Sequence, residues 1–249
     1  MKIERMIKNK KDYTLFFDNR KSIHVLEDTI VKHRLVVGKE IDYNILLQIE
    51  HDNQFSELYG KALRYLSIRM RSKQEMEQYL SKRSDNYQPI IKKLEQEHYL
   101  DDNRFSKAYI SDKFRLTTSG PLKIKQELMG LQLPETMIDN NLCQISEQEE
   151  QEKIKRLAEK KIKANTKDSA FKLRGRLFQY FITLGYHPDQ VNKVFDQIAW
   201  KNNQALEKEY QKLKRKWGTK YQGEELSNLL KTKLYQKGFT PDEINEYCQ

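Results

Sequence analysis

The chain has 249 residues, of which 37% are hydrophobic and 33% are charged, and its formal net charge is +10. So little apolar material argues against one large globular core and favours thin modules that each bury a narrow stripe. Met1–Arg20 is charged throughout, so no signal peptide is predicted, and no apolar run approaches the roughly 18 residues that a membrane span needs.

The cysteines, Cys143 and Cys248, lie far apart, no Cys-x-x-Cys pair occurs, and the histidines are scattered. Neither a structural zinc site nor a disulfide framework is predicted, and no cofactor is expected. A reduced, cytoplasmic protein with no membrane partner is the resulting expectation. The positive charge favours a polyanionic partner, nucleic acid first. The alternative is a lysine-rich solvated surface.

The first residues have the pattern of a small β structure. Tyr13–Phe17 is β-branched and aromatic, a turn-like Asp-Asn-Arg follows, and Ser22–Leu26 alternates apolar with polar residues. This pattern predicts a hairpin, with Met1–Met6 as a candidate third strand. A short helix is expected around Glu27–Val36, closed by Gly38. Met1–Glu40 is therefore predicted to be a small, mostly β cap.

From about Ile41 the apolar period changes to that of a helix. Ser72-Lys-Gln-Glu75 and Thr240-Pro-Asp-Glu243 are capping boxes, in which the hydroxyl and the carboxylate satisfy backbone N–H groups at a helix start. Gly120-Pro121 and His187-Pro188 are weaker start signals, with proline at the first helical position.

A helix–turn–helix pattern recurs along the chain. In each copy the first and last apolar residues lie ten positions apart, as in Leu80–Ile90, Leu128–Ile138, Phe181–Val191 and Leu234–Ile244. The last two copies share a glycine, an aromatic residue and a proline, at Gly185 to Pro188 and Gly238 to Pro241. A further helix is expected before each pair, over Glu57–Arg69, Asp102–Arg115, Gln151–Ala164 and Asn203–Trp217. Chance recurrence of common helix signals is the alternative.

The predicted fold is mainly α: tandem three-helix, helix–turn–helix-like repeats in an elongated curved array, with a small N-terminal β-rich cap. The β-hairpin cap is placed at residues 1–50. The four repeats are placed at residues 51–100, 101–145, 146–199 and 200–249.

Three segments resemble motifs of the RecX family. Ala62–Leu80 is similar to the opening of these proteins, Leu94–Phe105 to their central motif, and Ser119–Leu128 to the motif after it. The cap and four repeats resemble the long members from Gram-positive bacteria. Met70, where the family often carries proline, and His98, where it often carries glycine, depart from the pattern. Both departures are expected to leave the fold intact.

The resemblance implies a non-catalytic cytoplasmic regulator, here expected to be a monomer. In that family the modular body is thought to lie in the groove of the RecA–DNA filament, and to suppress strand exchange and RecA-stimulated cleavage. The implied partners are RecA protein and the RecA–ssDNA filament, with direct contact to ssDNA or dsDNA possible in principle. Stimulation in place of inhibition remains open.

The junction between the first two repeats contains Tyr99, Leu100, Asp101, Asp102 and Phe105. We expect the apolar residues to pack as a corner and Asp101 or Asp102 to cap the next helix. A catalytic aspartate pair is the disfavoured alternative, because no His, Lys or metal-ligand partner lies nearby in sequence. Gly120-Pro121 is expected to start a helix and does not fit a phosphate-binding loop.

Basic residues concentrate in the third repeat. Lys153, Arg156, Lys160 and Lys163 recur every three or four positions, which predicts one basic helical face. A set of candidate RecA or DNA contacts adds Arg174 and Arg176 to these, and extends across the first two repeats through Arg64, Arg69, Arg71, Lys73, Lys123 and Lys125. A second basic run contains Lys208, Lys212, Lys214, Arg215, Lys216 and Lys220. Phosphate contact would be strongly salt-dependent; a solvated face is the alternative.

Two other function classes compete with a RecA regulator. A helix–turn–helix regulator of DNA would place one helix in a major groove. A nuclease would need clustered carboxylates around a divalent metal, and the sequence shows no such cluster. A binding protein is therefore the preferred interpretation.

Overall fold

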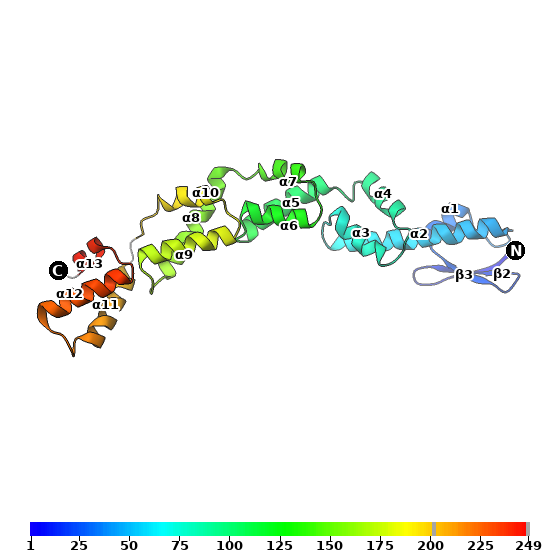
Figure 1. Cartoon of the computed structure of the whole chain (residues 1–249). Helices are drawn as coiled ribbons and strands as arrows, with labels where there is room; N and C mark the ends of the chain where they lie inside the picture. The colour runs from blue at the N-terminus through cyan, green and yellow to red at the C-terminus, as the bar shows by residue number, and fades with distance from the viewer. Residues whose placement is uncertain (201–202, 248–249) are drawn as a thin grey trace. The chain divides into compact units, whose positions relative to one another are not determined.

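The structure, a computed structural model, describes residues 1–200 and 203–247; Cys248 lies outside them. The chain divides into two compact units, Met1–Phe105 and Ser106–Gln249. Separate buried clusters occupy each unit: the cap and the first three-helix group in one, and the third and fourth groups in the other. Figure 1 labels the elements.

The N-terminal cap is a three-stranded antiparallel sheet of β1 (Ile3–Lys8), β2 (Tyr13–Phe17) and β3 (Ser22–Val25), in that order. The hairpin and its third strand are thus confirmed. A short helix, α1 (Glu27–His33), follows. It ends earlier than expected, at Arg34 with a φ of 49°, while Gly38, with a φ of 90°, lies in the next turn.

A single long helix, α2 (Tyr43–Ile68), connects the cap to the first three-helix group. The buried Asn53 fixes its first half to the cap. The Asn53 side chain accepts hydrogen bonds from the Leu26 N–H at 2.7 Å and the Thr29 hydroxyl at 3.2 Å, and donates one to the His24 carbonyl at 3.0 Å. The helix expected over Glu57–Arg69 therefore begins earlier, and the predicted domain boundary after residue 50 falls inside it.

The remaining described residues form the expected trios of helices (Figure 1). The second half of α2 groups with α3 and α4. Each later trio consists of one longer helix and a helical pair. The bounds are α3 (Lys73–Ser81), α4 (Gln88–Gln96), α5 (Asp102–Leu116), α6 (Pro121–Gly130), α7 (Glu135–Leu142), α8 (Glu147–Ala164), α9 (Ala170–Thr183), α10 (Pro188–Phe195), α11 (Asn203–Trp217), α12 (Gly223–Gln236) and α13 (Pro241–Tyr247).

The apolar residues that define the repeat all lie in the protein interior. None of the eight residues placed ten positions apart is more than 3% exposed, namely Leu80, Ile90, Leu128, Ile138, Phe181, Val191, Leu234 and Ile244. One residue from each helix of a pair therefore enters the core of its repeat, which explains why their spacing recurs.

The helices start at the predicted capping boxes and prolines. Both predicted capping boxes form, and Ser146 with Glu149 forms a third at the start of α8. Helices α6 and α10 begin at Pro121 and Pro188.

Left-handed residues end several helices. Gly185 and Gly238, with φ of 85° and 88°, follow α9 and α12 as predicted. His98 has a φ of 59°, so it takes the conformation that favours the glycine often found there in the family. Arg69, which precedes Met70, is extended, as residues before proline are. His98 thus has the backbone geometry that the motif glycine favours, and the residue before Met70 has the geometry found before the motif proline.

Candidate interaction surfaces

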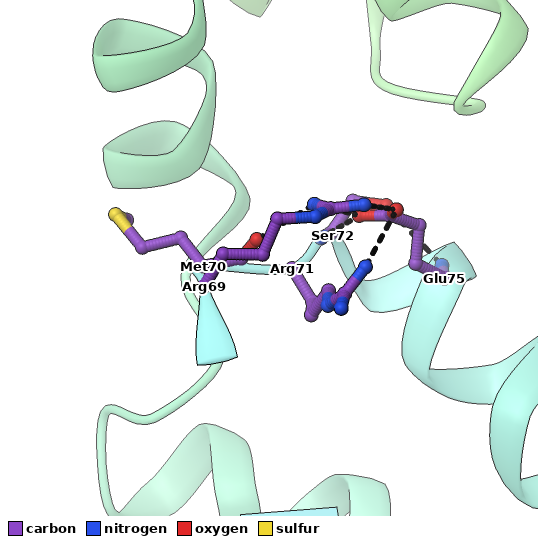
Figure 2. A network of polar contacts seen from close by, with 5 residues as sticks. All are labelled: Arg69, Met70, Arg71, Ser72 and Glu75. Carbon is purple, nitrogen blue, oxygen red and sulfur yellow. Dashed lines mark hydrogen bonds and ion pairs between the residues drawn. The ribbon is translucent and has the colours of Figure 1, made fainter. Parts of the chain in front are cut away.

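A polar network holds the linker between α2 and α3, as Figure 2 shows. The Ser72 hydroxyl accepts a hydrogen bond from the Glu75 N–H at 3.2 Å, and the Glu75 carboxylate accepts one from the Ser72 N–H at 3.1 Å. That carboxylate also pairs with Arg69 at 2.5 Å and Arg71 at 3.7 Å. Although burial opposes ionisation, Arg69 and the Ser72 N–H lower the pKa of Glu75 below its usual value. Both arginines thus stabilise the linker.

Arg71 also begins a stack of planar groups in the first repeat. Its guanidinium lies 4.0 Å from the Tyr65 ring centre, and Tyr65 stacks on Tyr79 at 4.0 Å with a 4° angle between the rings. The Arg83 guanidinium covers the other face of Tyr79 at 3.7 Å. Cations over aromatic faces are attracted by the ring electrons. Only 11% of the Arg71 side chain is exposed, so this residue is chiefly a structural part of its repeat.

The other basic candidates of the first two repeats differ in their surroundings. Lys73 pairs with Glu95 at 2.6 Å, and Lys125 pairs with Glu135 and Asp139, each at 2.7 Å. Arg64 is exposed on α2, and Lys123 is half-buried on α6. Phosphate contact by Lys73 or Lys125 would therefore compete with existing carboxylates, whereas the Arg64 side chain projects from the surface.

Lys153 departs most from its predicted place on an exposed basic face. The residue is only 5% exposed, and its ammonium donates to the Phe114 carbonyl and, at 3.0 Å, to the Ser119 carbonyl. The ammonium also lies 4.0 Å from the centre of the Phe114 ring. Burial, assisted by the nearby Arg156 charge, lowers the pKa of Lys153 to about 8. Lys153 therefore connects α8 to the end of α5.

The rest of the basic face of the third repeat lies on the surface. Arg156, Lys160 and Lys163 are exposed on α8. Two further candidates lie on α9, where Arg174 pairs with Asp196 at 2.7 Å and Arg176 pairs with Asp168 at 2.6 Å. Both α9 arginines remain accessible at the surface, since 44% and 63% of their side chains are exposed.

The motif at the start of α5 forms the expected corner only in part. Leu100 and Phe105 are buried, but Tyr99 is 56% exposed and lies outside the packed corner. Asp101 caps α5 by accepting from the Arg104 N–H at 2.9 Å. Asp102 instead accepts from the Lys73 N–H at 2.8 Å, at the start of α3. The two aspartates thus serve the starts of different helices.

Gly120 allows the start of α6 to meet the end of α9. Its N–H donates to the Leu184 carbonyl at 2.7 Å, and the Leu122 N–H donates to the Gly185 carbonyl at 2.9 Å. A Cβ on Gly120 would lie 2.5 Å from the Gly185 carbonyl oxygen. Free N–H groups at one helix start are therefore satisfied by carbonyls at the end of another helix. The opposite partial charges of the two helix ends also attract each other.

Sequence reasoning missed two kinds of surface residue. The stacked residues come from α2 (Tyr65), from α3 (Tyr79) and from the turn after α3 (Arg83). Only their alternation of aromatic with basic character hinted at the stack. Phe171 was not singled out, because an apolar residue in a helical pattern is expected to be buried, yet it is 75% exposed.

Within residues 1–200 and 203–247, no group of three or more His, Cys, Asp or Glu side chains is arranged to hold a metal ion. No helix in this part of the chain is long and apolar enough to cross a membrane.

Comparison with known proteins assigns the family. Family models described as the first, second and third three-helix domains of RecX match residues 59–84, 101–142 and 147–195. A regulatory protein RecX from Halalkalibacterium halodurans is 32% identical over 99% of this chain and 97% of its own length. This chain belongs to the RecX family. The resemblance predicted from the three sequence motifs is confirmed.

Other RecX proteins match at similar length. Regulatory protein RecX of Bacillus subtilis is 29% identical over 100% of this chain and 97% of its own. A crystal structure of a regulatory protein RecX aligns with a TM-score of 0.67 and 25% identity, covering 78% of this chain and 98% of that one. RecX from Lactobacillus salivarius aligns with a TM-score of 0.55 over 59% of this chain and 97% of its own. The mainly helical fold with its RecX three-helix domains is thus shared with known RecX structures.

Proposed function

We propose that this RecX-type regulator binds RecA and the RecA–ssDNA filament and inhibits recombinase and coprotease activity in DNA repair and the SOS response. The observation that carries the proposal is family membership along the whole chain, since relatives named as RecX regulators align over 99% of it. The protein is proposed to act as a cytoplasmic monomer, without catalysis or cofactor.

The repeats support a mechanism based on several weak contacts. Recurring three-helix groups offer similar surfaces at intervals, and a polymer such as a RecA filament offers similar sites at intervals. When one repeat is bound, the next binds at a high effective concentration, so weak contacts combine into tight binding. The exposed cations Arg156, Lys160 and Lys163 supply a surface for the phosphates of the filament or for acidic patches on RecA.

The proposal is tested by RecA ATPase and strand-exchange assays on ssDNA with this protein present below the RecA concentration. We expect inhibition of both activities, weakened when Arg156, Lys160 and Lys163 are changed together to alanine. A matched control replaces Lys10, Lys11 and Lys21, which are exposed in the cap. If neither inhibition nor filament binding by sedimentation is observed, the proposal is wrong.

A helix–turn–helix regulator of DNA has weaker support. Such proteins read base edges from a recognition helix, with phosphate contacts around it. The last helix of the second trio, α7, contains Glu135 and Asp139 but no Lys or Arg, and α13 contains Asp242 and Glu243 with no Lys or Arg. A sequence-specific footprint on duplex DNA in the absence of RecA would favour this function over the proposed one.

A further inference from the structure

Phe171 on α9 is an exposed aromatic residue surrounded by cations. It is 75% exposed, whereas Phe105, Phe181 and Phe195 are at most 4% exposed. Phe171 lies at the edge of a surface hollow that is lined by Phe171, Lys172, Arg174, Gly175, Phe178 and Asn192, among others. An aromatic ring in such a position is available to a partner that has both flat apolar surfaces and negative charge.

The hollow has a fixed apolar floor. Phe171, Arg174, Gly175 and Phe178 have the spacing i, i+3, i+4 and i+7, so they share one face of α9. Phe178 is held from below, because it packs against the core of the third repeat and contacts the edge of Phe195 with 6.5 Å between ring centres. The floor therefore keeps its shape without a ligand.

Gly175 keeps the hollow open. It lies in the interior of α9, where glycine destabilises a helix relative to alanine. A Cβ at this position would meet nothing within 4 Å, so packing does not require glycine here. Gly175 does not have a positive φ, so the backbone conformation does not require glycine either. The absence of a side chain instead leaves room beside the Phe171 ring.

The charge around the hollow is suited to phosphates. Lys172, Arg174 and Arg176 line it, with no carboxylate among the lining residues. The two arginines pair with Asp196 and Asp168. These surface ion pairs contribute little energy and exchange readily, so a strand phosphate can replace or share them. Proteins that bind single strands combine such cations with aromatic rings on which bases stack.

We propose that this hollow binds a single-stranded nucleic acid, with one base stacked on Phe171 over Gly175 and the flanking phosphates contacted by Lys172, Arg174 and Arg176. A duplex would not offer the face of a base to the ring. This inference rests on the proposed function in one respect, because that function makes DNA the nucleic acid that the protein meets.

The test measures binding of the full chain, without RecA, to labelled oligothymidylate by fluorescence anisotropy. Stacking supplies roughly 1–3 kcal/mol per base, so Phe171→Ala is expected to weaken binding at least about fivefold. Binding to an abasic strand of the same length is expected to be unchanged by this substitution. Tyr43→Ala is the control, because Tyr43 is 64% exposed and lies in the other compact unit.

Substitutions at Gly175 distinguish an effect on oligothymidylate binding from an effect on the stability of the fold. Gly175→Ala and the control Gly60→Ala, at another helix position where a Cβ meets nothing within 4 Å, are each expected to raise Tm by about 2–4 °C. Gly175→Leu, which fills the hollow, is expected to weaken oligothymidylate binding as much as Phe171→Ala does. Phe171→Trp is expected to retain binding and to show fluorescence quenching when a base stacks on the indole.

Two results would overturn the inference. One is unchanged oligothymidylate affinity in both Phe171→Ala and Gly175→Leu. The other is an equal loss on the abasic strand, which would mean that charge alone acts there. The outcome of the RecA assays does not depend on the outcome of the oligothymidylate assay. A protein that inhibits RecA but binds oligothymidylate independently of Phe171 would contradict this inference alone, and the reverse result would contradict only the proposed function.

Discussion

The second compact unit contains two junctions between repeats, and equivalent loops at these junctions are held by different kinds of contact. Between the second and third repeats, the loop before α6 is held through its backbone. The Tyr186 hydroxyl donates to the Thr118 carbonyl at 3.3 Å, and the Lys153 ammonium donates to the Ser119 carbonyl at 3.0 Å. The Gly120 N–H then donates to the Leu184 carbonyl. Consecutive residues of one loop are thus fixed by the neighbouring repeat.

Between the third and fourth repeats, the corresponding loop before α9 is largely satisfied by itself. The Asn165 side chain donates to the Asp168 carbonyl at 2.8 Å and accepts from the Asp168 N–H at 3.2 Å. The neighbouring repeat contributes the Lys237 carbonyl, which accepts from the Ser169 hydroxyl at 3.1 Å. Leu206 and Phe239, each 53 positions after Lys153 and Tyr186, are buried and apolar.

The comparison shows that a repeat junction needs buried contact but not a particular set of polar groups. Where the loop leaves carbonyls unsatisfied, the neighbouring repeat must supply donors, because an unpaired buried carbonyl is costly. Where an asparagine satisfies the loop locally, apolar side chains suffice. The first junction should therefore be more sensitive to substitution.

Gly185→Ala provides the largest test of this difference. A Cβ there would lie 2.3 Å from the Lys123 backbone nitrogen, and the φ of 85° disfavours any side chain. We expect a loss of more than about 3 kcal/mol in the free energy of unfolding. Urea unfolding followed by tryptophan fluorescence is suitable, since Trp200 and Trp217 both lie in this unit.

The matched substitution is Gly238→Ala at the other junction. Its φ of 88° gives the same backbone strain, but the nearest atom to a Cβ is the Ser169 hydroxyl at 2.9 Å, which belongs to a side chain and can rotate. The expected loss is about 1–2 kcal/mol. Equal losses at the two glycines would contradict the proposed difference between the junctions.

Gly120→Ala isolates the close contact from backbone strain. Gly120 has an ordinary φ of −90°, so alanine is tolerated by the backbone itself. The added Cβ would lie 2.5 Å from the Gly185 carbonyl oxygen, and would force the ends of α6 and α9 apart. We expect destabilisation of about 2–3 kcal/mol in the same unfolding assay. Gly130→Ala, where a Cβ would meet nothing within 4 Å, is the control and should not destabilise the chain.

The trios of helices could be predicted from the sequence because their boundaries and core positions depend on local signals. Capping boxes, prolines at first helical positions and glycines at helix ends act through nearby backbone, so their effect is readable from local spacing. Leu128 and Ile138, or Phe181 and Val191, mark core positions because each pair recurs with the same separation. Elements such as α5 and α8 were therefore anticipated to within a few residues.

The candidate site was less predictable because its residues depend on distant partners. Helical spacing groups Lys153 with Arg156 and Lys160, but only the position of the Phe114 and Ser119 carbonyls decides that Lys153 is buried. Likewise, the exposure of Phe171 depends on what the neighbouring elements leave uncovered. Periodicity identifies a face of a helix, and packing between repeats decides what covers it.

Lys153 gives the first junction a dependence on pH that the second one should lack. Burial lowers its folded-state pKa to about 8 from the usual 10.5. Between these values the unfolded chain binds more protons than the folded chain, so the Lys153 contribution to stability should rise with pH. The rise should be at most about 1.4 kcal/mol per pH unit. The measurement compares urea unfolding of the unmodified chain with Lys153→Met from pH 7 to 10. A stability difference that stays constant, or falls as pH rises, would show that Lys153 is not buried at this junction.

Ser169→Ala tests the hydrogen bond that the Ser169 hydroxyl makes across the second junction. The Ser169 hydroxyl accepts from the Lys172 N–H at 3.4 Å at the start of α9 and donates to the Lys237 carbonyl at 3.1 Å in the neighbouring repeat. Losing both should destabilise the chain by about 1–2 kcal/mol. Ser146→Ala is the control, because Ser146 is exposed and caps only its own helix, so about 0.5–1 kcal/mol is expected. The excess at Ser169 measures the contact between repeats. If the two serine variants lose equal stability, that hydroxyl acts only as a cap, and the second junction depends on apolar packing such as that of Leu206 and Phe239.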